Sequence, residues 1–186
     1  MDVNTGVLEE LHASISNWQR KQARSNEENW EYNKFEKALD EYEDSLSYAQ
    51  NKFGMTPIGE GRDRITFTSG KTVSSKIDVV VKMSKSDGGQ QNMDEVELYN
   101  MLEKDIEENS DKNVNEFIAP ILKYDNSYRW IIQQRASQGS PPGASKTVIE
   151  KLENIGWTCS DIRPDNVGLI KNEPVLIDLG LGLRKI

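Results

Sequence analysis

The chain has 186 residues, of which 35% are hydrophobic and 29% charged, and its formal net charge is −8. A single cysteine and a single histidine, His12, exclude an intrachain disulfide framework and a zinc site built on cysteine or histidine ligands. An acidic protein repels nucleic acid and anionic membranes, and the longest apolar runs are far too short to span a bilayer, so we expect neither partner. The first residues lack the basic start and the apolar stretch of a signal peptide, which favours a cytoplasmic location.

Residues 1–53 are predicted to form two amphipathic helices with a break at residues 22–29. The apolar residues of both helices recur at steps of three and four; they are Val7, Leu11, Ile15 and Trp18, then Phe35, Leu39, Tyr42, Leu46, Ala49 and Phe53. Residues 1–50 contain 11 acidic and 5 basic side chains, which lie on the other faces. These helices either pack on the rest of the molecule or form a coiled-coil or partner-binding arm.

The residue composition changes at Met55. From there, β-branched residues and glycines predict two or three antiparallel strands within residues 55–70 and 76–83. A helix is predicted over residues 92–109, with an apolar stripe at Met93, Val96, Tyr99, Leu102 and Ile106. Two further strands are predicted within residues 117–124 and 128–136, around a turn at 125–127. The segment 137–145 reads as a linker.

The last part of the chain is predicted to hold a helix at 145–156, an irregular loop at 157–166, and a hairpin of strands 167–170 and 175–178. Asp161 and Asn166 flank Pro164, which forbids a helix interior, so both must sit on a shaped loop. Asp178 follows an apolar strand, and a hairpin would return that strand beside the loop. Carboxylate and amide oxygens suit Mg²⁺, so we expect a magnesium site here.

The segments "DIRPDN" and "IDLG" resemble the catalytic loop and the metal-binding segment of protein kinases and aminoglycoside-phosphotransferase-like kinases. Three upstream segments resemble further elements of these families, in the same order. They are "IGEGRDRITF" for the glycine-rich phosphate loop, "DVVVKM" for the lysine strand, and "NMDEVELYNML" for the helix with its glutamate. The resemblance covers about residues 55–182. It implies an α+β fold, with a kinase-like N-lobe of five antiparallel strands and an αC-type helix.

The resemblance also implies roles in binding ATP and Mg²⁺. Asp161 would orient or deprotonate an acceptor hydroxyl, and Asn166 and Asp178 would hold the metal. Lys82, paired with Glu95, would hold the inner phosphates of the nucleotide. Because phosphoryl transfer asks mainly for positioning and charge neutralisation, these residue types suit the chemistry.

Further residues of the implied site flank these positions. Backbone N–H groups of Gly59, Glu60, Gly61 and Arg62 would cover the outer phosphates. Arg163 stands where many kinases have a lysine that faces the transferred phosphate.

Each assignment has a simpler interpretation. Lys82 could be a surface lysine on an edge strand, and Glu95 one of several solvated acids on its helix. Gly59 and Gly61 could be ordinary hairpin residues. Asp161 and Asn166 could form turns around Pro164, and Asp178 a turn before Gly180.

The sequence departs from the kinase pattern in two respects. Cys159 and Ser160 replace the usual His-Arg pair before the catalytic Asp, which favours small-molecule kinases and viral or atypical kinase-like proteins. "GGQQNMDEVELY" and "RPDNVGL" resemble short kinase-like proteins of phages, for which the host cytoplasm would be the location. The chain ends at Ile186, soon after Gly180, which implies a minimal C-lobe of one helix and the catalytic hairpin. We expect residues 1–53 to cover the apolar stretch "VLIDLGLGL" in place of the absent helices.

The predicted organisation is N-terminal helices at 1–53, a kinase-like N-lobe at 54–136 and a minimal C-lobe at 137–186. The predicted function is phosphotransfer from ATP, with Mg²⁺, to a hydroxyl of a protein, of a small molecule or of the chain itself. One alternative is a nucleotide-binding pseudokinase that regulates a partner. The other is an interaction protein that binds no nucleotide and uses its acidic N-terminal helices.

Overall fold

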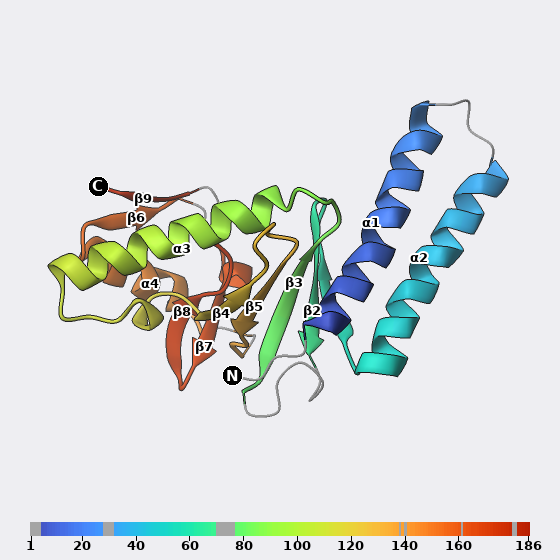
Figure 1. The fold of residues 1–186 in the computed structure, drawn as a ribbon. Coiled ribbons are helices and arrows are strands. Elements are labelled where there is room, and N and C mark those ends of the chain that lie inside the picture. Colours follow the sequence, from blue (N-terminus) through green and yellow to red (C-terminus); the bar gives the residue numbers. More distant parts are fainter. Residues whose placement is uncertain are drawn as a thin grey trace. The chain divides into compact units, whose positions relative to one another are not determined.

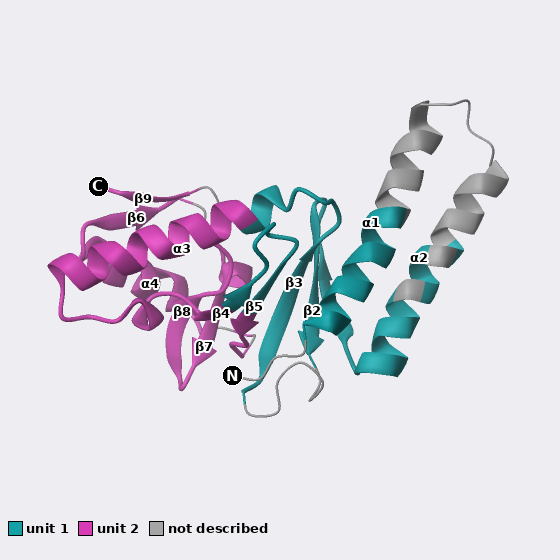
Figure 2. Ribbon diagram, in the orientation of Figure 1, with its two compact units in different colours: residues 1–92, 123–132 teal, residues 93–122, 133–186 magenta. Residues whose placement is uncertain are grey.

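The computed structural model describes residues 5–27, 32–69, 77–137, 139, 141–160, 162–179 and 182–186, with only the backbone at 18–27, 32–39, 41 and 45. The chain forms two compact units (Figure 2). Unit 1 comprises residues 1–92 and 123–132, and unit 2 comprises residues 93–122 and 133–186. Unit 1 thus contains the two N-terminal helices together with the first three strands.

Two helices open unit 1, α1 (Gly6–Glu27) and α2 (Tyr32–Phe53), and they pack against each other (Figure 1). The predicted helices are therefore present. The described side chains of the apolar stripes are buried, except for the half-buried Leu46; they are Val7, Leu11, Ile15, Tyr42, Ala49 and Phe53. The side chains of Trp18, Phe35 and Leu39 lie outside the described residues. The helices also pack on strands of their own unit, α1 on β3 and α2 on β1.

A five-stranded antiparallel sheet has the strand order β1-β2-β3-β5-β4. Its strands are β1 (Thr56–Glu60), β2 (Arg64–Ser69), β3 (Val79–Ser84), β4 (Ile121–Tyr124) and β5 (Trp130–Gln134). All six residues of the central strand β3 are buried, including the polar Lys82 and Ser84. The predicted strands of this region are confirmed, and the described residues contain four α-helices in all. Of these helices, none combines the length and the apolar character that a membrane span needs.

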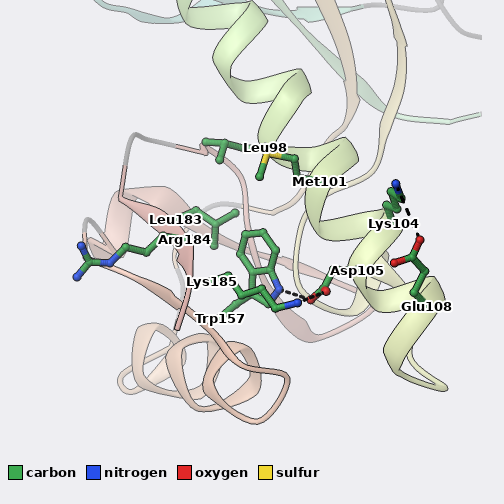
Figure 3. Close-up of a pocket in the computed structure, with 9 residues that line it drawn as sticks. All are labelled: Leu98, Met101, Lys104, Asp105, Glu108, Trp157, Leu183, Arg184 and Lys185. Atoms are coloured by element: carbon green, nitrogen blue, oxygen red, sulfur yellow. Dashed lines mark hydrogen bonds and ion pairs between the residues drawn. The ribbon is translucent and has the colours of Figure 1, made fainter.

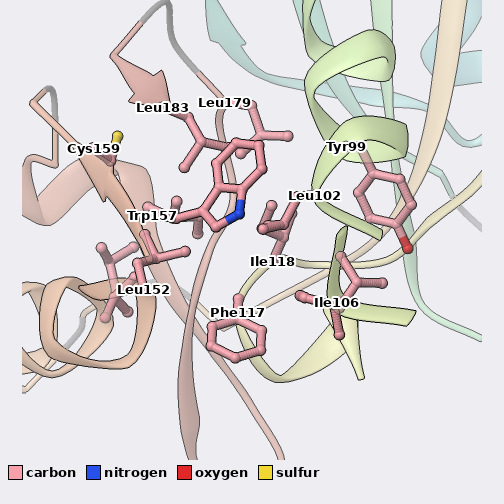
Figure 4. Packing of buried hydrophobic residues seen from close by; sticks show 14 of the residues in the cluster. Tyr99, Leu102, Ile106, Phe117, Ile118, Leu152, Trp157, Cys159, Leu179 and Leu183 are labelled. Atoms are coloured by element: carbon pink, nitrogen blue, oxygen red, sulfur yellow. The ribbon is translucent and has the colours of Figure 1, made fainter. Parts of the chain in front are cut away.

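Unit 2 has its own hydrophobic core, built on α4 (Ala144–Glu153) and on the amphipathic helix α3 (Gln90–Asn109), which belongs to unit 2 from Met93 onward (Figure 4). The short helices η1 (Val114–Glu116) and η2 (Pro164–Asn166) and the strands β6 (Trp157–Cys159), β7 (Val167–Ile170), β8 (Glu173–Leu176) and β9 (Leu183–Lys185) complete it. β7 pairs with β8 and β6 pairs with β9, both antiparallel. Trp157 is 2% exposed and belongs to this core.

The C-terminal region differs from the prediction in two ways. The predicted irregular loop begins with β6, and the residues after Gly180 include β9, which pairs with it. The expectation that residues 1–53 cover the last apolar stretch is wrong. Leu176, Leu179 and Leu183 are buried in the core of unit 2 itself, which also contains side chains of α3, α4 and β6.

Candidate functional site

The glycine-rich segment forms the tip of the β1–β2 hairpin. Gly59 is paired with Thr66, and a bulge precedes it between Pro57 and Gly59. The backbone N–H of Gly61 donates to the carbonyl of Arg64 at 2.9 Å and closes the turn. The Gly61 N–H, which was predicted to cover phosphates, is thus already hydrogen-bonded within the turn. This agrees with the simpler interpretation of Gly61 as an ordinary hairpin residue. The Arg62 side chain is 92% exposed and pairs with Asp63 at 3.2 Å.

Glu60, between the two glycines, is bound by two donors. Its Oε1 accepts from the Tyr42 hydroxyl of α2 at 2.8 Å and from Lys85 Nζ at 2.6 Å. Burial raises the pKa of Glu60, but the hydrogen bonds from Lys85 and Tyr42 outweigh it and hold that pKa below its ordinary value. Glu60 is therefore a carboxylate tied to the body of unit 1. Sequence reasoning missed Lys85 and Tyr42, because their pairing with Glu60 arises only in the folded sheet and helix.

Lys82 lies on the central strand β3, and its residue is only 4% exposed. The interpretation as a surface lysine on an edge strand is therefore wrong. In the sheet register, Lys82 stands opposite Thr66, and Thr66 stands opposite Gly59. The lysine is thus level with the glycine-rich turn, two strand spacings or about 10 Å away. Unit 1 brings together the two phosphate-binding elements that the sequence predicts.

Asn92 connects several parts of unit 1 and was not predicted as a site residue. Its side-chain amide donates to the carbonyl of Tyr128 at 2.9 Å and to the carbonyl of Lys82 at 3.3 Å. Its Oδ1 accepts from the buried Arg64 at 3.4 Å. Asn92 is 1% exposed, so its amide fixes the backbone of the Lys82 strand from the start of α3.

Glu95 is completely buried on α3, whereas Glu97 is exposed. The apolar stripe predicted for this helix accounts for the difference. Glu95 shares the buried face with Val96 and Tyr99, and Glu97 lies on the opposite face. The interpretation of Glu95 as a solvated acid is therefore wrong. A buried carboxylate is costly unless it is paired or hydrogen-bonded, so burial marks Glu95 as the distinctive acid of this helix.

The β7–β8 hairpin brings Asn166 and the segment of Asp178 together within unit 2. Asn166 ends η2, which begins with Pro164, and its residue is buried. The backbone N–H of Ile177 donates to the carbonyl of Asn166 at 2.9 Å, and Asp178 follows directly. The predicted return of the second strand beside the loop is therefore confirmed.

The local sequence accounts for this hairpin. Ile170 pairs with Glu173, which leaves a two-residue loop of Lys171 and Asn172. Both have positive φ, 52° and 68°, as a type I′ turn requires. At the other end of β7, a Cβ on Gly168 would lie 2.6 Å from the Cβ of Ala136, so only glycine fits there.

Asp161 and Arg163 are the remaining site residues of the predicted catalytic loop. Asp161 lies outside the described residues. Arg163 is exposed with an extended backbone, φ −107° and ψ 156°, and precedes η2. Over the part of the chain that the structure describes, no group of three or more His, Cys, Asp or Glu side chains could hold a metal ion.

A hollow of about 390 Å³ in unit 2 has none of the predicted site residues in its lining (Figure 3). α3, β6 and β9 line it, and Trp157 and Asp105 meet at its wall. The Trp157 indole N–H donates to Asp105 Oδ2 at 2.6 Å, and Lys185 also contacts this carboxylate. The hydrogen bond from Lys185 has the largest effect on the pKa of Asp105, followed by the bond from Trp157, and together they hold that pKa below its ordinary value. These contacts bind the last strand of the chain to α3.

No protein-family model matches the chain, and no curated protein matches it.

Proposed function

We propose that this protein is an ATP- and Mg²⁺-dependent phosphotransferase of the kinase-like type. The hydrogen bond from Ile177 to Asn166 carries the proposal, because it brings an amide and the segment of Asp178 to one edge of the terminal hairpin. Such a pair is what the motifs "DIRPDN" and "IDLG" require if they act on a common metal. The acceptor would be a hydroxyl of a protein, of a small molecule or of the chain itself.

The residues at this edge fit magnesium. Asn166 and Asp178 offer an amide oxygen and a carboxylate, which are hard oxygen ligands. A bound Mg²⁺ would neutralise negative charge on the nucleotide phosphates. The structure supports the fit by the adjacency of the two backbone segments, since ligands from the two ends of a hairpin need such proximity.

Unit 1 would supply the positive charge for the phosphates. Lys82 is a buried lysine in the middle of a sheet, and buried lysines are rare unless an anionic or polar partner compensates them. Its register with Gly59 aligns it with the turn that would cover the phosphates.

One observation favours a pseudokinase as the second candidate function. The N–H of Gly61 is already bonded to Arg64 within the turn, so this conformation offers the phosphates fewer backbone donors than an open glycine-rich loop would. Such a protein would bind the nucleotide through Lys82 and the metal residues, and turnover would be absent.

Transfer of labelled phosphate separates the two candidates. The purified chain is incubated with labelled MgATP, alone and with hydroxyl acceptors, and incorporation is measured. We expect Asp161→Asn to abolish transfer, because the amide cannot accept the hydroxyl proton. Asp165→Asn is the matched control, since Asp165 is an exposed acid of the same loop, and it should retain transfer.

Loss of transfer in both variants, or in neither, would remove Asp161 from its assigned role. Nucleotide binding by the wild-type chain without any transfer would favour the pseudokinase.

A further inference from the structure

We propose that Tyr42, on the N-terminal helix α2, is a positioning residue that holds the Gly59–Arg62 turn in place for nucleotide phosphates. The inference rests on the proposed function, and it gives the N-terminal helices a task in it. Tyr42 is 6% exposed, and its hydroxyl reaches Glu60, the residue between Gly59 and Gly61, at 2.8 Å.

Hydrogen bonds hold the turn on both sides, where it follows β1 and where it precedes β2. On the β1 side, Glu60 Oε1 accepts from both Tyr42 and Lys85. On the β2 side, the backbone N–H of Lys85 donates to the carbonyl of Asp63 at 3.0 Å. Lys85 thus contacts both limbs, and Tyr42 adds the contact from outside the sheet. A segment with two glycines has wide conformational freedom, so such contacts decide where it lies.

The same contacts neutralise the negative charge that Glu60 brings to the turn. A free carboxylate between the two glycines would repel a triphosphate. Lys85, whose side chain is 9% exposed, neutralises it at 2.6 Å, and Tyr42 donates to the same oxygen. A tyrosine hydroxyl carries its proton at neutral pH and is a donor there. Burial, and then the hydrogen bond to Glu60, raise the pKa of Tyr42 further.

Helix α2 provides its own control. Tyr48 also donates its hydroxyl to a carboxylate, Glu10 Oε1 at 2.7 Å, but this contact joins α2 to α1 and does not involve the turn. Tyr42→Phe and Tyr48→Phe each remove one hydroxyl–carboxylate bond from the same helix and keep the ring. Tyr48→Phe also removes the contact between its hydroxyl and Lys52, which likewise does not involve the turn. The difference between the two variants isolates the effect on the turn from any general effect on the helices.

Amide hydrogen exchange of the free protein, read on peptides that cover residues 58–64, measures how often the turn opens. A hydrogen bond to a charged group contributes a factor of about ten or more to such an equilibrium. We expect about tenfold faster exchange in Tyr42→Phe and wild-type exchange in Tyr48→Phe. In the background of Glu60→Ala, adding Tyr42→Phe should change exchange less than twofold, because the partner is already gone. Equal exchange in the two tyrosine variants would overturn the inference.

Calorimetric titration with MgATP then measures the dissociation constant of each variant. We expect it to rise several-fold in Tyr42→Phe and to stay at the wild-type value in Tyr48→Phe. If the wild-type chain binds MgATP and Tyr42→Phe binds it equally well, the positioning role alone is overturned. If the wild-type chain binds no MgATP, the proposed function fails and the positioning role fails with it. In that case, faster exchange in Tyr42→Phe would still identify the contact as structural.

Discussion

Replacing Gly89 by alanine should destabilise unit 1 strongly, because two features of the backbone exclude a side chain there. Gly89 has φ +47°, and a Cβ on it would lie 2.1 Å from the carbonyl oxygen of Tyr128 and 2.6 Å from its carbonyl carbon. The positive φ costs an alanine about 1–2 kcal/mol. Relief of the clash by moving the backbone costs about 1–3 kcal/mol more. The Tyr128 carbonyl also accepts from Asn92, so it is not free to move.

The expected loss for Gly89→Ala is therefore about 2–5 kcal/mol in the free energy of unfolding, measured by urea denaturation. Gly88→Ala is the control, since a Cβ on Gly88 meets nothing within 4 Å and the residue has no positive φ. That variant should stay within about 1 kcal/mol of the wild type. A loss below about 1 kcal/mol for Gly89→Ala, or equal losses for the two variants, would refute the close approach of Gly89 to Tyr128.

Two further predictions concern buried polar contacts. Trp157→Phe removes the indole N–H that donates to Asp105, and it should lower the free energy of unfolding by about 1–3 kcal/mol in urea denaturation; unchanged stability would contradict a role for this bond. The side chain of Arg129 lowers the pKa of Asp125 against the opposing effect of burial. Because the folded pKa is the lower one, Asp125 stabilises the fold above its ordinary pKa and loses that contribution as the pH falls through the folded value. The free energy of unfolding should therefore fall less steeply with decreasing pH in Asp125→Asn than in the wild type. Identical pH dependence in the two proteins would exclude a contribution from the Asp125 carboxylate.

Local sequence signals predicted most of the helices and strands. The strand β7 has the residues that the sequence indicated, because an apolar run is followed there by a polar turn. Glu95, which the resemblance to kinases implied as the glutamate of its helix, is buried, whereas the neighbouring Glu97 is exposed. Strands β6 and β9 were missed, since each has three residues and gains its hydrogen bonds only from a partner far along the chain.

The candidate site was predictable in its residue types and only partly in its contacts. The hairpin return beside Asn166 follows from strand lengths, and the structure contains it. The hydrogen bonds from Tyr42 and Lys85 to Glu60 could not be predicted from the spacing of residues in the sequence. They form between elements that meet only in the folded protein. The hydrogen bond from the Gly61 N–H to Arg64 depends on the type of turn that the chain adopts. The pattern of glycines does not determine that turn type.

Thermal unfolding with and without MgATP tests the proposed function most directly. A ligand at one hundred times its dissociation constant adds about 2.7 kcal/mol of stability. Each kcal/mol raises the melting temperature of a domain of this size by roughly 2–4 °C. We predict that MgATP raises the melting temperature of the wild type and of the exposed-lysine control Lys123→Met by about 5–10 °C. Most of this shift should disappear in Lys82→Met and in Asp178→Asn. No shift in the wild type, or an equal shift in all four proteins, would contradict nucleotide binding by these residues.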